Sequence, residues 1–312
     1  MPLYDKIELG AQADELGFIR DTFEKVLRLT DILAFVNADP LLSDALALKG
    51  GTAINLTVFS LPRLSVDIDL DYARNNSLPE MTAEREQINR VIARHMDGQG
   101  YHASSKARGH HSLDGLMWSY TNAAGAADSI KVEINYSMRA HVLPTERRPL
   151  LALGEGTVVT LAPIETYASK IVALLTRAAP RDVYDIDHLV QADLFAEPDQ
   201  HDLFRRCVVF YLAVGTDKVP DLADFSRILE LTPRRIRTQL QPVLHKRDWF
   251  DLPAAQQRVT DYLSQLLQLE LAEQEFLDAF QGGRWQPELL FSGDCLKRVR
   301  SHPMAVWKLN PR

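Results

Sequence analysis

The sequence LKGGTA at residues 48–53 and the sequence RLSVDIDLD at residues 63–71 decide the expected fold of this chain. The first places two glycines between a short apolar segment and a short helix. The second alternates apolar residues with Asp67, Asp69 and Asp71, which is typical of a β-strand with one apolar face and one acidic face. Because residues i and i+2 of a strand point to the same side, this strand presents Asp67 and Asp69 together.

This order of elements predicts nucleotidyl transfer. Two carboxylates on one strand face can hold a pair of divalent cations, Mg²⁺ or Mn²⁺, about 3.5–4 Å apart, which is the arrangement that supports in-line phosphoryl transfer. Gly50 and Gly51 let the backbone approach a phosphate closely, and the helix that follows offers free N–H groups at its positive end. The alternative is an exposed strand face with solvated acids, although acids are depleted in strands and repel one another there.

The bulk properties of the chain exclude several classes of protein. A length of 312 residues fits about two domains, and the net charge of −7 gives no global basic field, so a nucleic acid would have to bind to a local patch. Cys207 and Cys295 fit no metal or redox spacing and are expected to be free thiols. We find no signal-peptide pattern and no apolar run long enough to span a bilayer, so we expect a cytoplasmic protein without a membrane partner.

The fold class that we expect is α+β, with a mixed sheet and flanking helices in residues 1–160 and an all-helical domain in residues 161–312. In the first part, helical spacing covers 12–38, 52–59 and 81–96, the last with Thr82 as its N-cap. Strand-like runs lie at 45–49, 65–72, 100–106, 115–121 and 129–137, of which the last three form an antiparallel meander, and 157–161 adds an edge strand.

The second part is almost entirely helical from Pro163 onward, because apolar positions recur there at helical spacing. The expected helices lie at residues 163–178, 182–195, 199–214, 221–230, 233–246 and 254–280.

Several residues near the acidic strand are further candidates for the site. Arg63 can bind a phosphate or pair with Asp71, and Ser65 can donate to a phosphate oxygen or merely end the loop. Thr52 can take part in phosphate binding or serve only as a helix N-cap.

A second alternating strand, KVEIN at residues 131–135, carries one acid between apolar neighbours. Glu133 can supply the third carboxylate of a two-metal site and help to hold the metal that activates the attacking hydroxyl. Lys131 lies on the same strand face, so a salt bridge between Lys131 and Glu133 is the alternative.

Two segments of the helical part also carry charged candidates. Lys170 and Arg177 are seven residues apart on one flank of the first helix, where they are either solvated or able to bind a triphosphate. The segment RDVYD at residues 181–185 follows, and its acids alone are better explained as an N-cap and a first-turn acid of the next helix than as site residues.

Taken together, these segments resemble the AbiEii/AbiGii-type nucleotidyltransferase toxins of bacterial abortive-infection and toxin–antitoxin systems. The resemblance covers residues 45–189 and rests on LKGGTAINL, RLSVDIDLDY, KVEINY, SKIVALLTR and RDVYDIDHL in that order. It implies a DNA polymerase β-like nucleotidyltransferase fold, an NTP as co-substrate and a cognate antitoxin encoded nearby. Some members of this family act on the 3′ end of tRNA, so the resemblance implies a tRNA acceptor and an arrest of growth or of phage propagation.

The resemblance also implies roles for particular residues. The family's downstream aspartate corresponds to Asp185, with Asp182 as the alternative, and its helical lysine, which is tied to the triphosphate, corresponds to Lys170. The expected metal ligands are Asp67, Asp69 and Glu133, and the same three residues with Lys170 and Asp185 are the expected catalytic set. The expected nucleotide-binding residues are Gly50, Gly51, Thr52, Arg63, Ser65 and Lys170.

Two other functions remain open at this point. A small-molecule nucleotidyltransferase of the antibiotic-modifying type would keep the acids but would not need basic helices. Residues 221–247, which contain SRILELTPRRIRTQL, could instead form a non-catalytic helix-turn-helix module. The helical part has basic residues that could bind tRNA phosphates, namely Arg234, Arg235, Arg237, Lys246, Arg247, Arg284, Lys297, Arg298 and Arg300.

Overall fold

The computed structural model describes residues 4–104, 108–110 and 112–310, which divide into two compact units. The sheet unit consists of the chain up to Arg139, Thr145–Leu161 and Pro242–Asp248. The helical unit consists of Ala140–Pro144, Ala162–Gln241 and the chain from Trp249 onward. The chain passes from the sheet unit to the helical unit between Leu161 and Ala162. Two short segments depart from this division, because Ala140–Pro144 belongs to the helical unit and Pro242–Asp248 belongs to the sheet unit.

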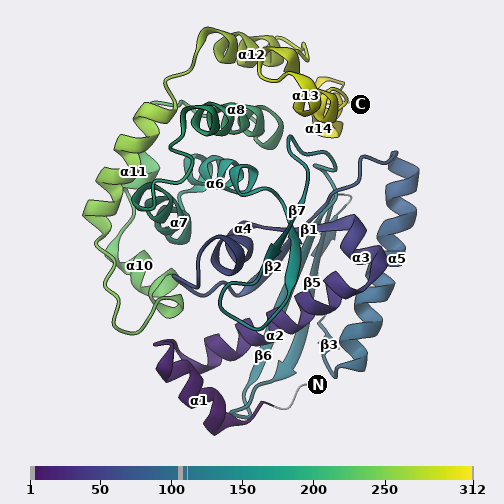
Figure 1. The fold of residues 1–312 in the computed structure, drawn as a ribbon, viewed down its shortest axis with the longest axis vertical. Helices are drawn as coiled ribbons and strands as arrows, with labels where there is room; N and C mark the ends of the chain where they lie inside the picture. The colour runs from purple at the N-terminus through teal and green to yellow at the C-terminus, as the bar shows by residue number, and fades with distance from the viewer. Residues whose placement is uncertain (1–3, 105–107, 111, 311–312) are drawn as a thin grey trace. The chain divides into compact units, whose positions relative to one another are not determined.

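The described part of the sheet unit contains an eight-stranded mixed sheet (Figure 1) with the order β3-β5-β6-β2-β1-β8-β7, in which β4 pairs with β5. β2 pairs in parallel with β6 and antiparallel with β1, so the mixed sheet that we expected is confirmed. The expected meander is also present, because β3, β5 and β6 pair antiparallel in turn. The strands are β1 (Leu46–Lys49), β2 (Asp67–Tyr72), β3 (His102–Ala103), β4 (Arg108–His110), β5 (Leu113–Thr121), β6 (Ala127–Asn135), β7 (Glu146–Pro149) and β8 (Thr157–Thr160).

The prediction that 157–161 forms an edge strand is wrong. β8 pairs with β1 on one side and with β7 on the other, so β7 forms that edge of the sheet. The sequence of β7, ERRP, lacks the apolar alternation by which strands are recognised, because its position at an edge places few side chains in the core.

The described residues of the sheet unit include the five helices α1 to α5. The longest, α5, has Ser77 as its N-cap rather than the predicted Thr82, because Ser77 and Glu80 form a reciprocal capping box that satisfies the first N–H groups of the helix. Thr82 instead bonds to the carbonyl of Leu78 within the helix. The helices are α1 (Lys6–Glu15), α2 (Arg20–Ala38), α3 (Pro40–Ala45), α4 (Gly50–Ala53), which continues as a π-helical turn at Ile54–Val58, and α5 (Leu78–Gly98).

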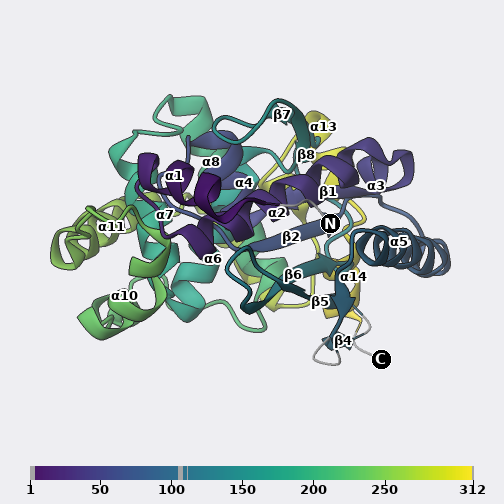
Figure 2. The same cartoon turned by 90° about the horizontal axis from the view of Figure 1, so that it is seen from below.

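The two faces of the sheet differ as the sequence predicts. Ile68, Leu70 and Tyr72 of β2 are buried on the apolar face, where the Tyr72 hydroxyl donates to Glu84 of α5 at 2.6 Å. On this face α2 and α5 run along the strands, as Figure 1 and Figure 2 show, and Arg28 of α2 lies over the Tyr120 ring of β5. The opposite face carries the alternate, acidic positions of β2.

The helical unit contains α6 to α14, which confirms the helical character of the second part. α6 packs against α7 and α8, and α7 packs against α11. The predicted helix at 254–280 is two helices, because a capping box formed by Glu270 and Glu273 starts a new helix after a turn. The helices are α6 (Pro163–Arg177), α7 (Pro180–Gln191), α8 (Pro198–Gly215), α9 (Ser226–Leu229), α10 (Pro233–Gln239), α11 (Leu252–Leu266), α12 (Leu271–Gln281), α13 (Gly293–Val299) and α14 (Pro303–Leu309).

One buried acid binds the segment Ala140–Pro144, which belongs to the helical unit although its sequence neighbours on both sides belong to the sheet unit. The Glu165 carboxylate of α6 accepts from the backbone N–H groups of Val142 and Leu143 at 2.7 and 2.9 Å and from the Tyr211 hydroxyl at 2.7 Å.

Among the helices that the structure describes, none is both long and apolar enough to cross a membrane.

Candidate active site

The acidic face of the sheet brings together the three carboxylates that the sequence selected as metal ligands. β2 and β6 are in register with Asp67 opposite Lys131 and Asp69 opposite Glu133, and directly opposed residues of neighbouring strands point to the same side of a sheet. All four side chains belong to half-buried residues, so they are accessible and only partly solvated.

A lysine already neutralises part of this face. Lys131 Nζ lies 2.7 Å from Glu133 Oε2, so the salt bridge that was the alternative for Glu133 is present. Partial burial opposes the charged form of Lys131, but the bond to Glu133 and the charges of Asp67 and Asp69 outweigh it and raise the pKa of the lysine. The acidic face therefore has a field that attracts cations.

Asp71 differs from the two acids before it. It is 2% exposed and forms an ion pair with Lys49 of the neighbouring strand β1. Asp71 is therefore a buried, charge-paired residue rather than part of the accessible acidic face.

The carboxylates of this face are suitable ligands for a divalent cation, but their positions do not form a complete coordination site. Carboxylate oxygens are the ligands that Mg²⁺ prefers, and Asp67 and Asp69 supply them on one face. Within residues 4–104, 108–110 and 112–310, no group of three His, Cys, Asp or Glu side chains converges as a preformed metal site. Glu133 Oε2 is held by Lys131, so a cation that used this oxygen would have to displace the lysine.

The glycine turn packs directly against this acidic face. Gly50 has a φ of +67°, and a Cβ atom added to it would lie 2.9 Å from Asp69 Oδ2. A Cβ atom on Gly51 would lie 2.7 Å from Arg63 Nη2 and 3.0 Å from Ser65 Oγ. The position of Gly50 therefore favours glycine because of its positive φ, a Cβ atom at Gly51 would require Arg63 or Ser65 to shift, and the turn lies directly against Asp69 of β2.

Hydrogen bonds hold the start of α4 against β2. The Thr52 hydroxyl donates to the backbone oxygen of Asp67 and lies 2.9 Å from the Ser65 hydroxyl. Thr52 is not an N-cap, because Lys49 occupies that position of α4. The structure thus places Thr52 and Ser65 beside the glycine turn, as the sequence suggested.

Arg63 lies beneath the same turn and is almost fully buried, with 1% of its surface exposed. Its Nη1 donates to the carbonyl of Leu64 at 2.9 Å, and its backbone N–H donates to the Asn55 side chain at 3.3 Å. Asn55 in turn donates to the carbonyl of Gly51 at 2.7 Å. Arg63 is therefore built into the support of the turn.

A second charged cluster lies in the helical unit and contains the other two candidates. Lys170 Nζ of α6 lies 3.0 Å from Asp182 Oδ1 and 3.0 Å from Asp185 Oδ2, both on α7. Arg177, also on α6, places its Nε 3.0 Å from Asp182 Oδ2. Lys170 is 8% exposed and each aspartate 2%, so Lys170 is not a solvated helix flank.

Asp182 is an ion-pair partner and not a helix cap. The N-cap of α7 is Ala179, which makes no side-chain capping bond. Burial alone raises the pKa of Asp182, but the charges of Lys170 and Arg177 and the hydrogen bonds from them outweigh it and hold this pKa below its ordinary value of 3.8.

Several of the basic residues expected to bind RNA are engaged in local contacts. Arg235 donates to the carbonyl of Ala178 at 3.4 Å, Arg298 to that of His141 at 3.2 Å, and Lys297 pairs with Asp294 at 2.8 Å. Lys246 and Arg247 belong to the sheet unit rather than to the helical part, and Lys246 pairs with Asp14 at 2.6 Å. Arg234 and Arg237 of α10 remain exposed.

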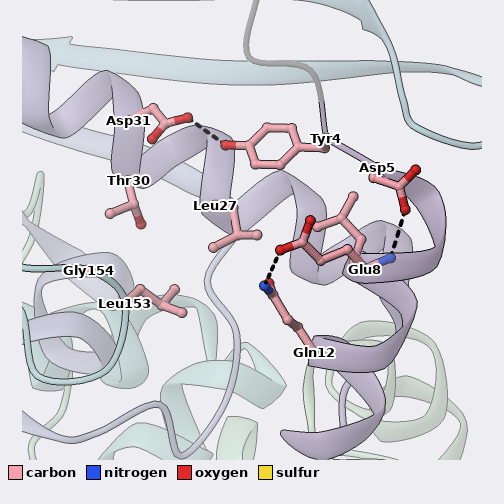
Figure 3. Close-up of a pocket in the computed structure, with 10 residues that line it drawn as sticks. Tyr4, Asp5, Glu8, Gln12, Leu27, Thr30, Asp31, Leu153 and Gly154 are labelled. Atoms are coloured by element: carbon pink, nitrogen blue, oxygen red, sulfur yellow. Dashed lines mark hydrogen bonds between the residues drawn. The ribbon is translucent and has the colours of Figure 1, made fainter.

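A cavity of about 310 Å³ lies elsewhere in the sheet unit, between α1, α2 and residues 153–154 (Figure 3). Its acids are already used locally. Asp5 accepts from two backbone N–H groups at the start of α1, Glu8 accepts from Gln12, and Asp31 accepts from the Tyr4 hydroxyl. None of the candidate residues lines this cavity, so it is not the candidate active site.

Comparison with solved structures supports the fold. The chain matches MenT4, a nucleotidyltransferase toxin from Mycobacterium tuberculosis H37Rv, with a TM-score of 0.62 and 17% sequence identity over 98% of each chain. At this identity the match shows a shared fold. The comparison with curated proteins gives no match.

Comparison with protein families gives the class. The family model for the nucleotidyl transferase AbiEii toxin of type IV toxin–antitoxin systems matches residues 31–281. The chain therefore belongs to the AbiEii family of nucleotidyltransferase toxins and is a nucleotidyltransferase, which confirms the resemblance found in the sequence. Membership of this family implies an NTP substrate and a cognate antitoxin.

The close approach of the glycine turn to the acidic face leads to a stability prediction. Gly50→Ala should destabilise the chain by about 1–2 kcal/mol, because a Cβ atom is strained in the left-handed region, with a further cost from the contact with Asp69. Gly98→Ala, where no atom lies within 4 Å of the added Cβ, is the matched control and should not destabilise it. Urea unfolding of both variants measures the effect, and an unchanged midpoint for Gly50→Ala would contradict the packing described.

The charge pairs of Asp182 predict a pH dependence of stability. Because its folded-state pKa is lowered, its contribution is present above the ordinary value of 3.8 and is lost as the pH falls through the folded value. At neutral pH, Asp182→Asn should lose about 3–5 kcal/mol, as when one partner of a buried ion pair is removed. Urea unfolding between pH 7 and pH 3 should show this difference shrinking below about pH 4. A difference that stays constant over the range would exclude the ion pairs as its cause.

Proposed function

We propose that this nucleotidyltransferase toxin is metal-dependent and transfers a nucleotide from an NTP to the 3′ end of tRNA, which arrests growth or phage propagation. The observation that carries the metal-dependent step is the contact between the glycine turn and the acidic face, where Gly50 approaches Asp69. A triphosphate bound by the turn would have its charged oxygens next to the carboxylates that bind cations.

The roles that we assign on the acidic face follow from its charges. Bound Mg²⁺ would offset the charge of the triphosphate and lower the pKa of the attacking hydroxyl. Asp67 and Asp69 would hold the cations, and Glu133 could provide a further carboxylate ligand beside Lys131. Gly50 and Gly51 present backbone to the triphosphate, while Thr52, Ser65 and Arg63 keep the turn in place.

We also assign catalytic roles to Lys170 and Asp185, on the basis of their positions in the family motifs. Lys170 provides positive charge for the triphosphate, and Asp185, which lies 3.0 Å from it, fixes its position. The burial of Lys170 against two buried aspartates supports this assignment, because buried ionisable groups with specific charge partners are frequent in functional sites.

For the acceptor, we propose that exposed arginines of the helical unit bind tRNA phosphates. Arg234 and Arg237 are the best placed, since Arg235 bonds to the end of α6. We further propose that the cognate antitoxin restrains the enzyme in the cytoplasm.

The assignment of Asp67 and Asp69 is tested by incubating the protein with each labelled NTP, total tRNA and Mg²⁺. Asp67→Asn and Asp69→Asn should each lower transfer more than about 100-fold, because a lost metal ligand weakens the bound cation. Their melting temperatures should change little, since both side chains are half-buried on an accessible face. The exposed acid Asp97 of α5 provides the control Asp97→Asn, and equal transfer by all four proteins would refute the assignment.

The RNA-binding role of α10 predicts a change in salt dependence. Arg234→Ala together with Arg237→Ala should lower the slope of log affinity for tRNA against log salt by about 0.7–0.9 for each phosphate that the variant no longer binds. Arg90→Ala together with Arg94→Ala on α5 is the control with the same change in net charge. If the α10 variant binds and modifies tRNA as the wild type does, these arginines are only surface residues. Labelling of a small molecule, with no RNA labelled under any NTP, would favour the antibiotic-modifying type.

A further inference from the structure

Trp249, in the helical unit just before α11, is a large aromatic side chain that the fold leaves in solvent. It is 89% exposed, more than any other large hydrophobic residue in the described part of the chain. A single exposed apolar side chain needs no explanation by itself, so its surroundings decide whether it has a role.

One face of α7 holds the end of α10 and the neighbour of Trp249 together. Arg181 Nε donates to the carbonyl of Gln239, the last residue of α10, at 3.0 Å. The centroid of the Tyr184 ring lies 5.5 Å from that of the Phe250 ring. Because Arg181 and Tyr184 are three residues apart on α7, they share a face of that helix. Trp249 therefore lies near the C-terminal end of α10, within the helical unit (Figure 1).

The surroundings of Trp249 carry charges of both signs. Arg234 and Arg237 of α10 are exposed, and Arg237 belongs to the last turn of that helix. Two acids, Asp248 and Asp251, flank Trp249 in the sequence. A phosphate is attracted by the arginines and repelled by the acids, whereas an uncharged nucleobase can lie directly on the tryptophan ring.

We propose that Trp249 is a stacking platform for an unpaired base of the acceptor RNA, whose phosphates bind to Arg234 and Arg237. The inference rests on the RNA acceptor of the proposed function, and it adds the requirement that this RNA present an unpaired nucleotide. Proteins that bind single strands combine aromatic rings, on which bases stack, with cationic side chains that follow the backbone. A base within a duplex is already stacked on both sides, so only an unpaired base can use the ring.

An apolar protein surface, such as that of a second copy of this chain, makes different predictions. Apolar contact depends on the area that is buried, so a leucine would replace Trp249 in part. Stacking requires an aromatic face, so a phenylalanine would replace it and a leucine would not. The charged residues around Trp249 favour the RNA, because the core of a protein–protein interface is depleted in charged residues.

The first test is the affinity of the full-length protein for total tRNA, measured by filter binding over a series of salt concentrations. Trp249→Ala should weaken binding about 5- to 150-fold at every salt concentration, which is the range for the loss of one stacked base. The slope of log affinity against log salt should not change, because a stacked base releases no counterions. Trp249→Phe should recover most of the loss, and Trp249→Leu should not. Trp307→Ala, which removes a tryptophan of α14 that is 58% exposed, is the control and should bind as the wild type does.

A second test addresses the unpaired base. Trp249→Ala should bind single-stranded oligouridylate more weakly than the wild type does, but both proteins should bind the duplex of oligouridylate with oligoadenylate equally. In transfer to tRNA, Trp249→Ala should raise the KM for tRNA and leave the KM for NTP unchanged.

Two results would overturn the role of Trp249 and leave the proposed function intact, since the wild type would still label tRNA. One is an unchanged affinity of Trp249→Ala for tRNA, and the other is an equal loss of affinity for the single strand and the duplex. A dimer of the wild type that Trp249→Ala abolishes, detected by sedimentation, would assign the ring to a second copy of the chain instead. A wild type that neither binds nor labels any RNA would refute the proposed acceptor itself, and this inference with it.

Discussion

The close contact between the glycine turn and β2 is the constraint on which the candidate site depends. Only hydrogen atoms fit at Gly50 and Gly51 if Asp69, Arg63 and Ser65 are to stay where they are. That contact sets how far the start of α4 stands from the acidic face, and Thr52 fixes the distance further through its bond to the backbone of Asp67. The strand pairing of β2 with β6 then brings Glu133 beside Asp69.

Local sequence pattern was enough to predict the parts of this arrangement that depend on one segment at a time. The period-two alternation of β2 identifies both faces of the strand, and the Gly-Gly pair identifies the turn. The partners of Lys131 and Asp71 could not be chosen from sequence alone, because each has several opposite charges within reach until the strand register is known. For the same reason the joint contact of Asp182 with Lys170 and Arg177 became visible only when α6 and α7 were seen packed together.

The arginines of the helical unit show why counts of basic residues overestimate a nucleic-acid surface. Arg227 and Arg235 donate to carbonyls at the end of α6, and Arg181 donates to the carbonyl of Gln239 at the end of α10. Carbonyls at a helix end have no partner within the helix, so long side chains from neighbouring segments satisfy them. A sequence motif does not distinguish such an arginine from one whose side chain is available to bind a phosphate.

The ion pair between Lys131 and Glu133 affects how the acidic face would bind a divalent cation. Lys131 acts there as a built-in counterion, so a divalent cation that bound the same oxygen of Glu133 would have to replace an ammonium group. One Mg²⁺ that took the place of this ammonium group would raise the positive charge on the face by one unit, whereas a second Mg²⁺ would add its full two units. Binding of a cation through that oxygen would thus be coupled to a side-chain movement of β6.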